Sequence, residues 1–149
     1  MSKKLSILTV TLKQRMPVFE NLARVLKTQA NSSVEMLAVC DSGEKTIGAK
    51  RNELLEAAKG DYVVFVDDDD MVSPFYVFGI LEAIKQNPDC CGIEGIITIR
   101  NVGPKKFIHS IQYQDWFEKD DIYYRCPNHL NPIKREIALD TKFPDQSWQ

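Results

Sequence analysis

Short apolar runs alternate with segments of helical periodicity over the first 90 residues, and this alternation constrains the fold more than any other feature. Three runs have the length of buried strands, at residues 5–10, 34–40 and 62–66. Three segments have helical spacing: one that opens at Pro17 and fades near residue 30, one at 48–60 and one at 75–86. This order predicts the α/β class, with a mostly parallel sheet and helices on both faces.

The pattern changes after residue 89. Residues 92–99 and 105–113 are strand-like and are joined by a turn sequence, so we expect an antiparallel pair in the C-terminal portion. We expect residues 114–132 to form a loop that carries aromatic side chains, and 132–140 to form a short helix. At the start of the third helix, Ser73 is the expected N-cap and Pro74 the expected first-turn residue.

The composition is that of one soluble globular domain with a sizeable core, since 44% of the 149 residues are hydrophobic and the net charge is −2. No basic stretch is long enough to indicate nucleic-acid binding. The apolar run near the start is too short for a signal peptide or a membrane span, so we expect a cytoplasmic protein. The four cysteines form no CxxC pair, which favours free thiols over a zinc site.

Polar residues follow each predicted strand: Thr11 after the first, Asp41 after the second and four consecutive aspartates, 67–70, after the third. The carboxyl ends of parallel strands share one edge of a sheet, so these residues could line one cleft. Two carboxylates about 4 Å apart repel by about 4 kcal/mol near a protein surface, which favours a bound cation. Mg²⁺ and Mn²⁺ prefer such oxygen ligands and leave positions for phosphates. The alternative is a solvated acidic turn in which Asp70 or Ser73 caps the next helix.

Two cations, Lys50 and Arg51, stand at the start of the second predicted helix. They could meet a diphosphate with help from the helix N-terminus, or they could form a solvated basic face. The GxxxxGK[ST] and GxGxxG loops of other nucleotide-binding proteins are absent from the sequence.

Three stretches resemble the motifs of one enzyme family. "SILTVTLKQR" is similar to a strand followed by "PTYNR", with Thr11 and Arg15 on the threonine and arginine, and "CDSG" matches a "DDGS"-like turn through Asp41. "GAKRNELLEAAKGDYVVFVDDDD" resembles "GARNxGxxxAxGxYxxFLDxDD", with Asp67 and Asp69 on the DxD motif. The chain thus resembles the inverting glycosyltransferases of family 2, which implies a single GT-A (Rossmann-like) domain over residues 1–149. Residues 1–90 would then be the nucleotide-sugar-binding half, and 91–149 the acceptor-side half.

The resemblance implies roles for individual residues. Thr11 and Asp41 would contact the nucleoside, with Asp41 accepting a hydrogen bond from the base, and Arg51 would approach the diphosphate. Asp67 would lie near the ribose and, with Asp69, hold Mn²⁺ or Mg²⁺. Asp68, in the variable middle position of the donor site, would face solvent. The donor would be a nucleotide-diphosphate sugar, most commonly a UDP-sugar, and the acceptor a saccharide or another hydroxyl compound.

The general base of the family is an acid that closely follows a phrase like "FPDxxF". Here "FPDQSWQ" ends at Gln149, so the base is expected just beyond it and the acceptor-side half is expected to be truncated, with Asp145 as a weaker candidate. His129 could touch a phosphate or the metal, or be a loop histidine bonded to the backbone. Trp116, Tyr123 and Tyr124 could stack on a sugar or pack in the core.

Two other functions remain open from the sequence. A haloacid-dehalogenase-like phosphohydrolase has a strand ending in DxDx[TV], and "FVDDDDM" fits the acids, although Met71 fails the last position. A non-catalytic nucleotide-sugar-binding fragment would keep the donor site and lack the base.

Overall fold

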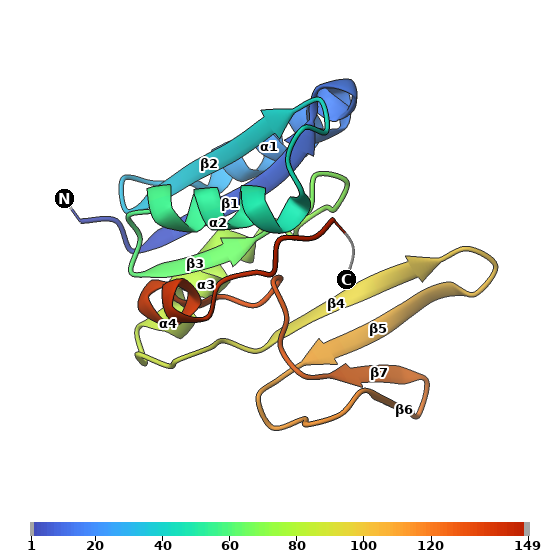
Figure 1. Ribbon diagram of the computed structural model, residues 1–149. Helices are drawn as coiled ribbons and strands as arrows, with labels where there is room; N and C mark the ends of the chain where they lie inside the picture. Colours follow the sequence, from blue (N-terminus) through green and yellow to red (C-terminus); the bar gives the residue numbers. More distant parts are fainter. Residues whose placement is uncertain (1, 148–149) are drawn as a thin grey trace.

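The computed structural model describes residues 2–147 and contains two four-stranded sheets (Figure 1). The first sheet has the order β2-β1-β3-β8. Its strands are β1 (Leu5–Leu12), β2 (Val34–Asp41), β3 (Tyr62–Phe65) and β8 (Ile133–Lys134). The first three are parallel and β8 is antiparallel to β3, so the α/β class and the mostly parallel sheet are confirmed.

Helices cover both faces of this sheet, as predicted (Figure 1). The helices are α1 (Met16–Gln29), α2 (Ile47–Ala57), α3 (Tyr76–Ile84) and α4 (Arg135–Thr141), and a 3₁₀ turn, η1 (Lys13–Arg15), precedes α1. On one face, Leu22 of α1 and Val77 of α3 pack against Leu5 and Val64. On the other face, Leu54 and Leu55 of α2 pack against Leu8 and Phe65, and α4 completes the layer. Alternate residues of the strands therefore supply two separate cores.

The start of α3 differs from the prediction. Phe75 is the N-cap residue and its own side chain makes no capping bond, while Gln29 of α1 accepts from the N–H of Val77 at 3.0 Å. Ser73 contributes its backbone oxygen instead, which accepts from the N–H of Tyr76 at 3.2 Å. The predicted capping by Ser73 is therefore wrong, because the chain leaves the acidic turn through an additional backbone turn before the helix begins.

The second sheet has the order β4-β5-β7-β6, and its strands are β4 (Ile93–Ile99), β5 (Gly103–His109), β6 (Phe117–Lys119) and β7 (Ile122–Arg125). The predicted antiparallel pair corresponds to β4 and β5. The loop predicted at residues 114–132 is wrong in part, because it contains β6 and β7, and β7 pairs with β5 in parallel. These strands have three and four residues, too few to show a periodicity, and they are stabilised by contacts such as the stacked rings of Phe117 and Tyr124.

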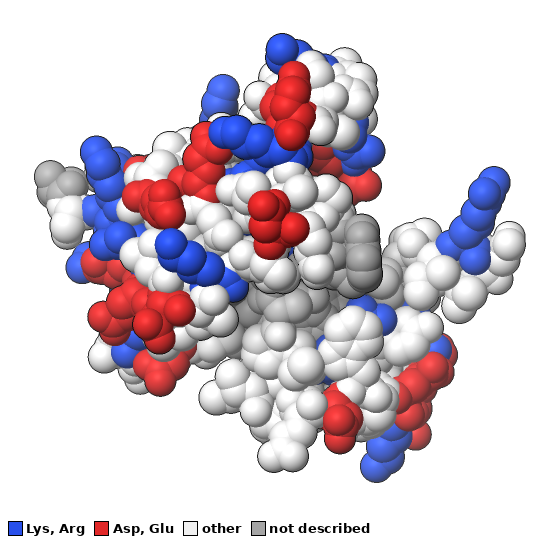
Figure 2. Space-filling model, viewed as in Figure 1, with Lys and Arg blue, Asp and Glu red and all other residues white. Residues whose placement is uncertain are grey.

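Acidic and basic side chains are interspersed over the face seen in Figure 2, and neither sign dominates it. Several apolar side chains are exposed on the second sheet and its connections, including Ile96, Val102, Ile111 and Trp116. Within residues 2–147, no helix is both long enough and apolar enough to cross a membrane.

Candidate functional site

The ends of β1 and β3 meet one cavity of about 820 Å³ at the carboxyl edge of the first sheet, and beyond β2 the residues in its described lining are Gly43 and Lys45 rather than Asp41. Its lining includes residues from β1, from α2, from the turn after β3 and from the loop before β8, among them Thr11, Lys50, Arg51, Asp67, Asp69 and His129. The convergence follows from the parallel order of β2, β1 and β3, which places their C-terminal ends side by side. Residues 143–147 form a further wall, which the sequence did not indicate.

Asp68 also lines the cavity, but it is buried and its carboxylate is bonded to other side chains rather than facing solvent. Its Oδ2 accepts from Thr11 Oγ1 at 2.8 Å and from Arg15 Nε at 2.8 Å, and its Oδ1 accepts from Arg15 Nη2 at 2.5 Å. The hydrogen bonds from Arg15 are the main reason that the pKa of Asp68 lies below its ordinary value. The expectation of a solvent-facing Asp68 is therefore wrong, because Arg15 lies in η1 directly beyond β1 and reaches the buried carboxylate.

Asp67 and Asp69 face the cavity on either side of Asp68. The side chain of Asp69 is 61% exposed and lies 3.3 Å from Arg15 Nη2. Both carboxylate oxygens of Asp67 lie 3.2 Å from His129 Nε2, and Oδ1 lies 3.7 Å from Arg51. Burial would raise the pKa of Asp67, but the hydrogen bond from His129 and the charges of His129 and Arg51 lower it overall. The structure thus brings together the two residues of the predicted DxD motif.

The acidic turn carries more negative charge than its neighbours balance. Burial, together with the nearby Asp67 and Asp69, raises the pKa of Asp70 to about 6. Within residues 2–147, no group of three or more His, Cys, Asp or Glu side chains forms a ready-made metal site. Asp67 and Asp69 nevertheless fit Mg²⁺ or Mn²⁺, because these ions commonly take one or two carboxylates and complete their shell with water and phosphate oxygens.

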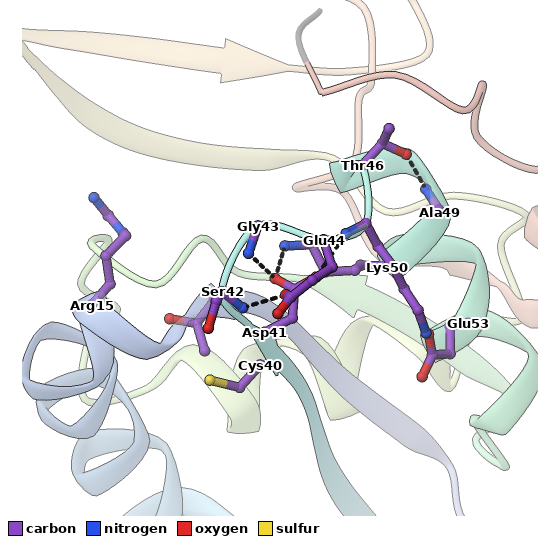
Figure 3. Close-up of polar contacts among 12 residues, drawn as sticks. Arg15, Cys40, Asp41, Ser42, Gly43, Glu44, Thr46, Ala49, Lys50 and Glu53 are labelled. Atoms are coloured by element: carbon purple, nitrogen blue, oxygen red, sulfur yellow. Dashed lines mark hydrogen bonds and ion pairs between the residues drawn. The ribbon is translucent and has the colours of Figure 1, made fainter.

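Asp41 and Lys50 form an ion pair at the same edge of the sheet (Figure 3). Lys50 Nζ donates to Asp41 Oδ1 at 2.7 Å, and the backbone N–H groups of Gly43 and Lys45 also donate to this carboxylate. The hydrogen bond from Lys50 is the main cause that lowers the pKa of Asp41 to about 2. The sequence suggested Lys50 as a diphosphate ligand and did not indicate this pair, which forms because α2 folds back beside the end of β2.

Arg51 is buried between two aromatic rings. Its guanidinium lies 5.8 Å from the ring centre of Phe65 and 5.2 Å from that of Phe143. Burial lowers the pKa of Arg51, while the charge of Asp67 opposes this effect. The aromatic rings hold the guanidinium at the cavity wall, so Arg51 is a fixed positive charge beside the acidic turn.

His129 stands on a loop that hydrogen bonds fix in place. Its carbonyl accepts from Phe65 N–H at 3.2 Å. Asn131 accepts from the N–H of Asn128 and from Nδ1 of the buried His109, and it donates to the carbonyl of Cys91. His129 is therefore a loop histidine bonded through its backbone, and its side chain reaches Asp67 in the cavity, while its contact with a phosphate or a metal stays a prediction.

Residues 143–147 lie along the first turns of α2. The amide side chain of Asn52 donates to the carbonyl of Phe143 at 2.9 Å and accepts from the N–H of Phe143 at 2.8 Å. Gly48 N–H donates to Gln146, and Thr46 Oγ1 donates to the exposed Asp145. The carboxylate of Asp145, the weaker candidate for the base, is thus engaged at the start of α2, and the position expected beyond Gln149 lies outside the described residues.

The aromatic residues considered for sugar stacking lie on the second sheet or, for Trp116, directly before β6, and they are absent from the described lining of the cavity. Arg125 lies 4.5 Å from the ring centre of Trp116 and 5.2 Å from that of Tyr123, and Tyr124 stacks on Phe117 at 4.9 Å. Packing within the sheet accounts for these contacts, and binding of a sugar by these rings stays a prediction.

Comparison with solved structures shows a shared fold. The first 349 residues of Staphylococcus aureus TarS match with a TM-score of 0.63 and 14% identity, over 95% of this chain and 50% of that one. The same portion in complex with UDP-GlcNAc gives 0.63 and 14%, over 95% and 48%. A further TarS structure gives 0.57 and 15%, over 95% and 30%. The present chain therefore spans half or less of each TarS chain that it matches.

A search of curated proteins gave no match. The family model described as "Glycosyl transferase family 2" matches residues 20–140, which is most of the chain and includes α2, the acidic turn and the second sheet. With the motifs, the fold and the family model in agreement, the chain belongs to glycosyl transferase family 2.

Proposed function

We propose that this chain binds a nucleotide-diphosphate sugar in the cavity and transfers the sugar, with inversion and metal assistance, to a saccharide or other hydroxyl acceptor. The observation that carries the proposal is the arrangement of the cavity. Its lining brings Asp67 and Asp69 together with Arg51 and Lys50, and Lys50 is paired with Asp41 behind it. The volume of about 820 Å³ is in the range of small-molecule sites, roughly 300–1,000 Å³.

The donor would lie with its nucleoside toward Thr11 and Asp41 and its diphosphate toward Arg51. Asp68 would support this site from within, since it holds both Thr11 and Arg15 by hydrogen bonds. A UDP-sugar is the donor we propose, because TarS, which shares the fold, forms a complex with UDP-GlcNAc. Residues 1–90 supply most of the proposed site, and His129 and residues 143–147 complete it from the acceptor-side half. We further propose that the protein acts in the cytoplasm.

Asp69, with Asp67, would hold Mn²⁺ or Mg²⁺ and leave room for diphosphate oxygens. The chemistry that such a cation supplies is Lewis-acid stabilisation of the departing nucleoside diphosphate. Burial and the nearby carboxylates of Asp67 and Asp69 raise the pKa of Asp70, and the clustering of these carboxylates supports the assignment. His129 would orient Asp67 through their hydrogen bond, and Arg51 would attract the diphosphate from its fixed position.

Titration calorimetry with UDP tests this proposal. We expect UDP binding to depend on Mn²⁺, and we expect Asp69→Ala to abolish that dependence. Glu20→Ala, which changes an exposed acid on α1, is the matched control and should bind as the native chain does. Equal UDP affinity with and without Mn²⁺ in the native chain would contradict the metal assignment, and absence of binding would contradict the donor site.

A second candidate function is binding of a nucleotide sugar without transfer. It is favoured by the engagement of Asp145, the candidate base named from the sequence, with Thr46. Release of UDP from UDP-GlcNAc, measured with a panel of saccharide acceptors, separates the two functions. Acceptor-dependent release that Asp145→Asn removes would assign the base to Asp145. The phosphohydrolase alternative is not proposed further, because the chain belongs to a glycosyl transferase family.

A further inference from the structure

We propose that two copies of this chain associate through the outer edge of β4. The two β4 strands would pair antiparallel about a two-fold axis, so that the second sheets of both copies become one continuous sheet. The axis would pass between the two copies of Ile96, the middle residue of β4. This inference goes beyond the proposed function, because it concerns the second sheet and not the cavity.

The first support is the unpaired edge of β4. This strand pairs with β5 on one side, and no strand among residues 2–147 pairs with its other side. In Figure 1 the hairpin of β4 and β5 projects beyond the helices, so its tip is accessible. Every second residue of such a strand directs its N–H and C=O groups away from its neighbour. The seven residues of β4 include no proline or lysine and one charge, Glu94, so β4 lacks most of the features that prevent edge pairing.

The second support is the way the residues of β4 face one another in such a pair. A two-fold axis at Ile96 places this residue opposite its own copy, and it is 65% exposed in the single chain. The same register pairs the whole strand, because position 93 then faces 99, position 94 faces 98 and position 95 faces 97. Isoleucine occupies four of the seven positions, and β-branched residues on facing strands stabilise a strand pair. The pair would therefore be mainly apolar, with no like charges directly opposite each other.

The third support is charge complementarity at both ends of the strand pair. Glu94, Ile96 and the exposed Arg100 are separated by even numbers of residues, so they share the exposed face of β4 and its extension. In the register centred on Ile96, Glu94 of one copy is the diagonal neighbour of Arg100 of the other, a distance that long side chains can span. The two-fold axis creates two such pairs. The charges thus favour a second copy over a strand of arbitrary sequence.

The opposite edge of the second sheet, β6, is a poorer partner for β4. It has three residues, so a head-to-tail pairing of β4 with β6 would match fewer than half of the seven positions of β4. Such a pairing is not closed by symmetry and would continue from copy to copy into a fibre. Pairing of β4 with itself is complete after two copies. The closed dimer is therefore the assembly that this sheet favours.

Sedimentation velocity over a range of protein concentrations tests the proposal. Two short strands bury less surface than a standard interface, so we expect a reversible equilibrium between monomer and dimer. Ile96→Lys places two ammonium groups opposite each other at the axis and should leave only monomer. Ile111→Lys is the matched control, because Ile111 is also an exposed isoleucine and lies beyond β5, away from β4. Thermal unfolding of both variants checks that they fold.

Charge reversal tests the register of the two strands. Arg100→Glu places two carboxylates in each diagonal pair and should raise the dissociation constant of the dimer roughly tenfold. Adding Glu94→Arg to this variant restores opposite charges and should return the dissociation constant toward that of the native chain. The loss of the pair between Glu94 and Lys106 should matter little for folding, because both side chains are exposed.

Hydrogen exchange locates the interface within the dimer. The amides of residues 93–99 should exchange more slowly at high protein concentration, and those of β6 should not change. A native chain that is monomeric at every concentration would overturn the proposal, as would a dimer that Ile96→Lys leaves intact. Growth into larger assemblies would assign the contact to β4 with β6 and overturn it as well. None of these outcomes depends on UDP binding, so the proposed function is tested separately.

Discussion

Asp68 and Asp69 are neighbours in the sequence, but their carboxylates lie in different surroundings. Asp68 is buried and accepts three hydrogen bonds from Thr11 and Arg15, whereas Asp69 is exposed at the cavity. The two residues are the central pair of a turn in which the N–H of Asp70 donates to the carbonyl of Asp67, so a run of four aspartates can serve both purposes. At this scale, a structural and a proposed functional carboxylate belong to adjacent residues.

We expect Asp68→Asn to destabilise the fold by about 1–3 kcal/mol, because it weakens a buried network and leaves the Arg15 guanidinium poorly paired. Asp69→Asn is the matched change on the exposed neighbour and should alter the free energy of unfolding by less than about 0.5 kcal/mol. Urea denaturation of both variants measures the difference. Equal stability of the two variants would mean that the Asp68 network contributes nothing to folding.

The Asp41 carboxylate should make stability depend on acidic pH. Its pKa in the folded chain is lowered from 3.8 to about 2, so the unfolded chain takes up the proton first as the pH falls. The ionised Asp41 carboxylate therefore contributes its full stabilisation above its pKa in the unfolded chain. This stabilisation is lost as the pH falls through its pKa in the folded chain. We expect the stability difference between the native chain and Asp41→Asn to shrink between about pH 5 and about pH 2.

Denaturation of both proteins at several pH values in this range tests the assignment. Asp67 and Asp68 also have lowered pKa values, so only the difference between the two proteins isolates Asp41. A stability difference between the native chain and Asp41→Asn that stays constant with pH would contradict the lowered pKa of Asp41.

The sequence could indicate Thr11, Asp41 and Asp67 as one site because the direction of parallel strands alone brings their ends together. It could not indicate which aspartate is buried, since that depends on Arg15, 53 residues away from Asp68. The sequence also could not indicate the pairing of Lys50 with Asp41, because helical periodicity does not identify the partner of a lysine side chain in the first turn of a helix. Tertiary contacts decide both cases, across 53 residues for Arg15 and Asp68 and across 9 for Asp41 and Lys50.

Helix α2 joins the proposed donor site to the segment at residues 143–147. Its first turns carry Lys50 and Arg51, and the same turns hold the segment through Gly48 and Asn52. A Cβ atom on Gly48 would lie 1.7 Å from the carbonyl oxygen of Pro144, so only glycine permits this close approach. The helix therefore sets the position of a cavity wall that is remote in the sequence.

We expect Gly48→Ala to displace residues 143–147, to weaken UDP binding and to destabilise the fold by about 1–3 kcal/mol, as overpacking does. Gly79→Ala is the matched control on α3, because a Cβ there meets nothing within 4 Å. It should stabilise the chain by roughly 0.5–1 kcal/mol, since glycine is unfavourable within a helix. Thermal unfolding and UDP titration of both variants provide the measurements, and native-like UDP affinity in Gly48→Ala would refute the coupling.

The two sheets of the molecule are linked through the loop that carries His129. Asn131 bonds to His109 at the end of β5 and to the carbonyl of Cys91 before β4, and Cys91 N–H donates to Pro132 at 2.8 Å. The loop then enters β8, which pairs with β3. The placement of His129 beside Asp67 thus depends on contacts with both sheets.

Asn131→Ala should lower the free energy of unfolding by about 1–3 kcal/mol, because it leaves buried polar groups without partners. It should also weaken Mn²⁺-dependent UDP binding, since His129 would lose its fixed position. Asn21→Ala, on the exposed side of α1, should leave both quantities unchanged. Loss of stability without any change in UDP affinity would show that the loop has no part in the site.

The close contact between α2 and residues 143–147 has a consequence for how this chain can evolve. Gly48 can be replaced only in a lineage that has already moved Pro144 away from the helix, and a change at Asn52 removes both bonds to Phe143 at once. Asp41 and Lys50 are tied in the same way, because either one alone would be left as a buried charge. Substitutions at these pairs of positions should therefore be inherited together, and a single replacement should be tolerated only on a background that already carries its partner.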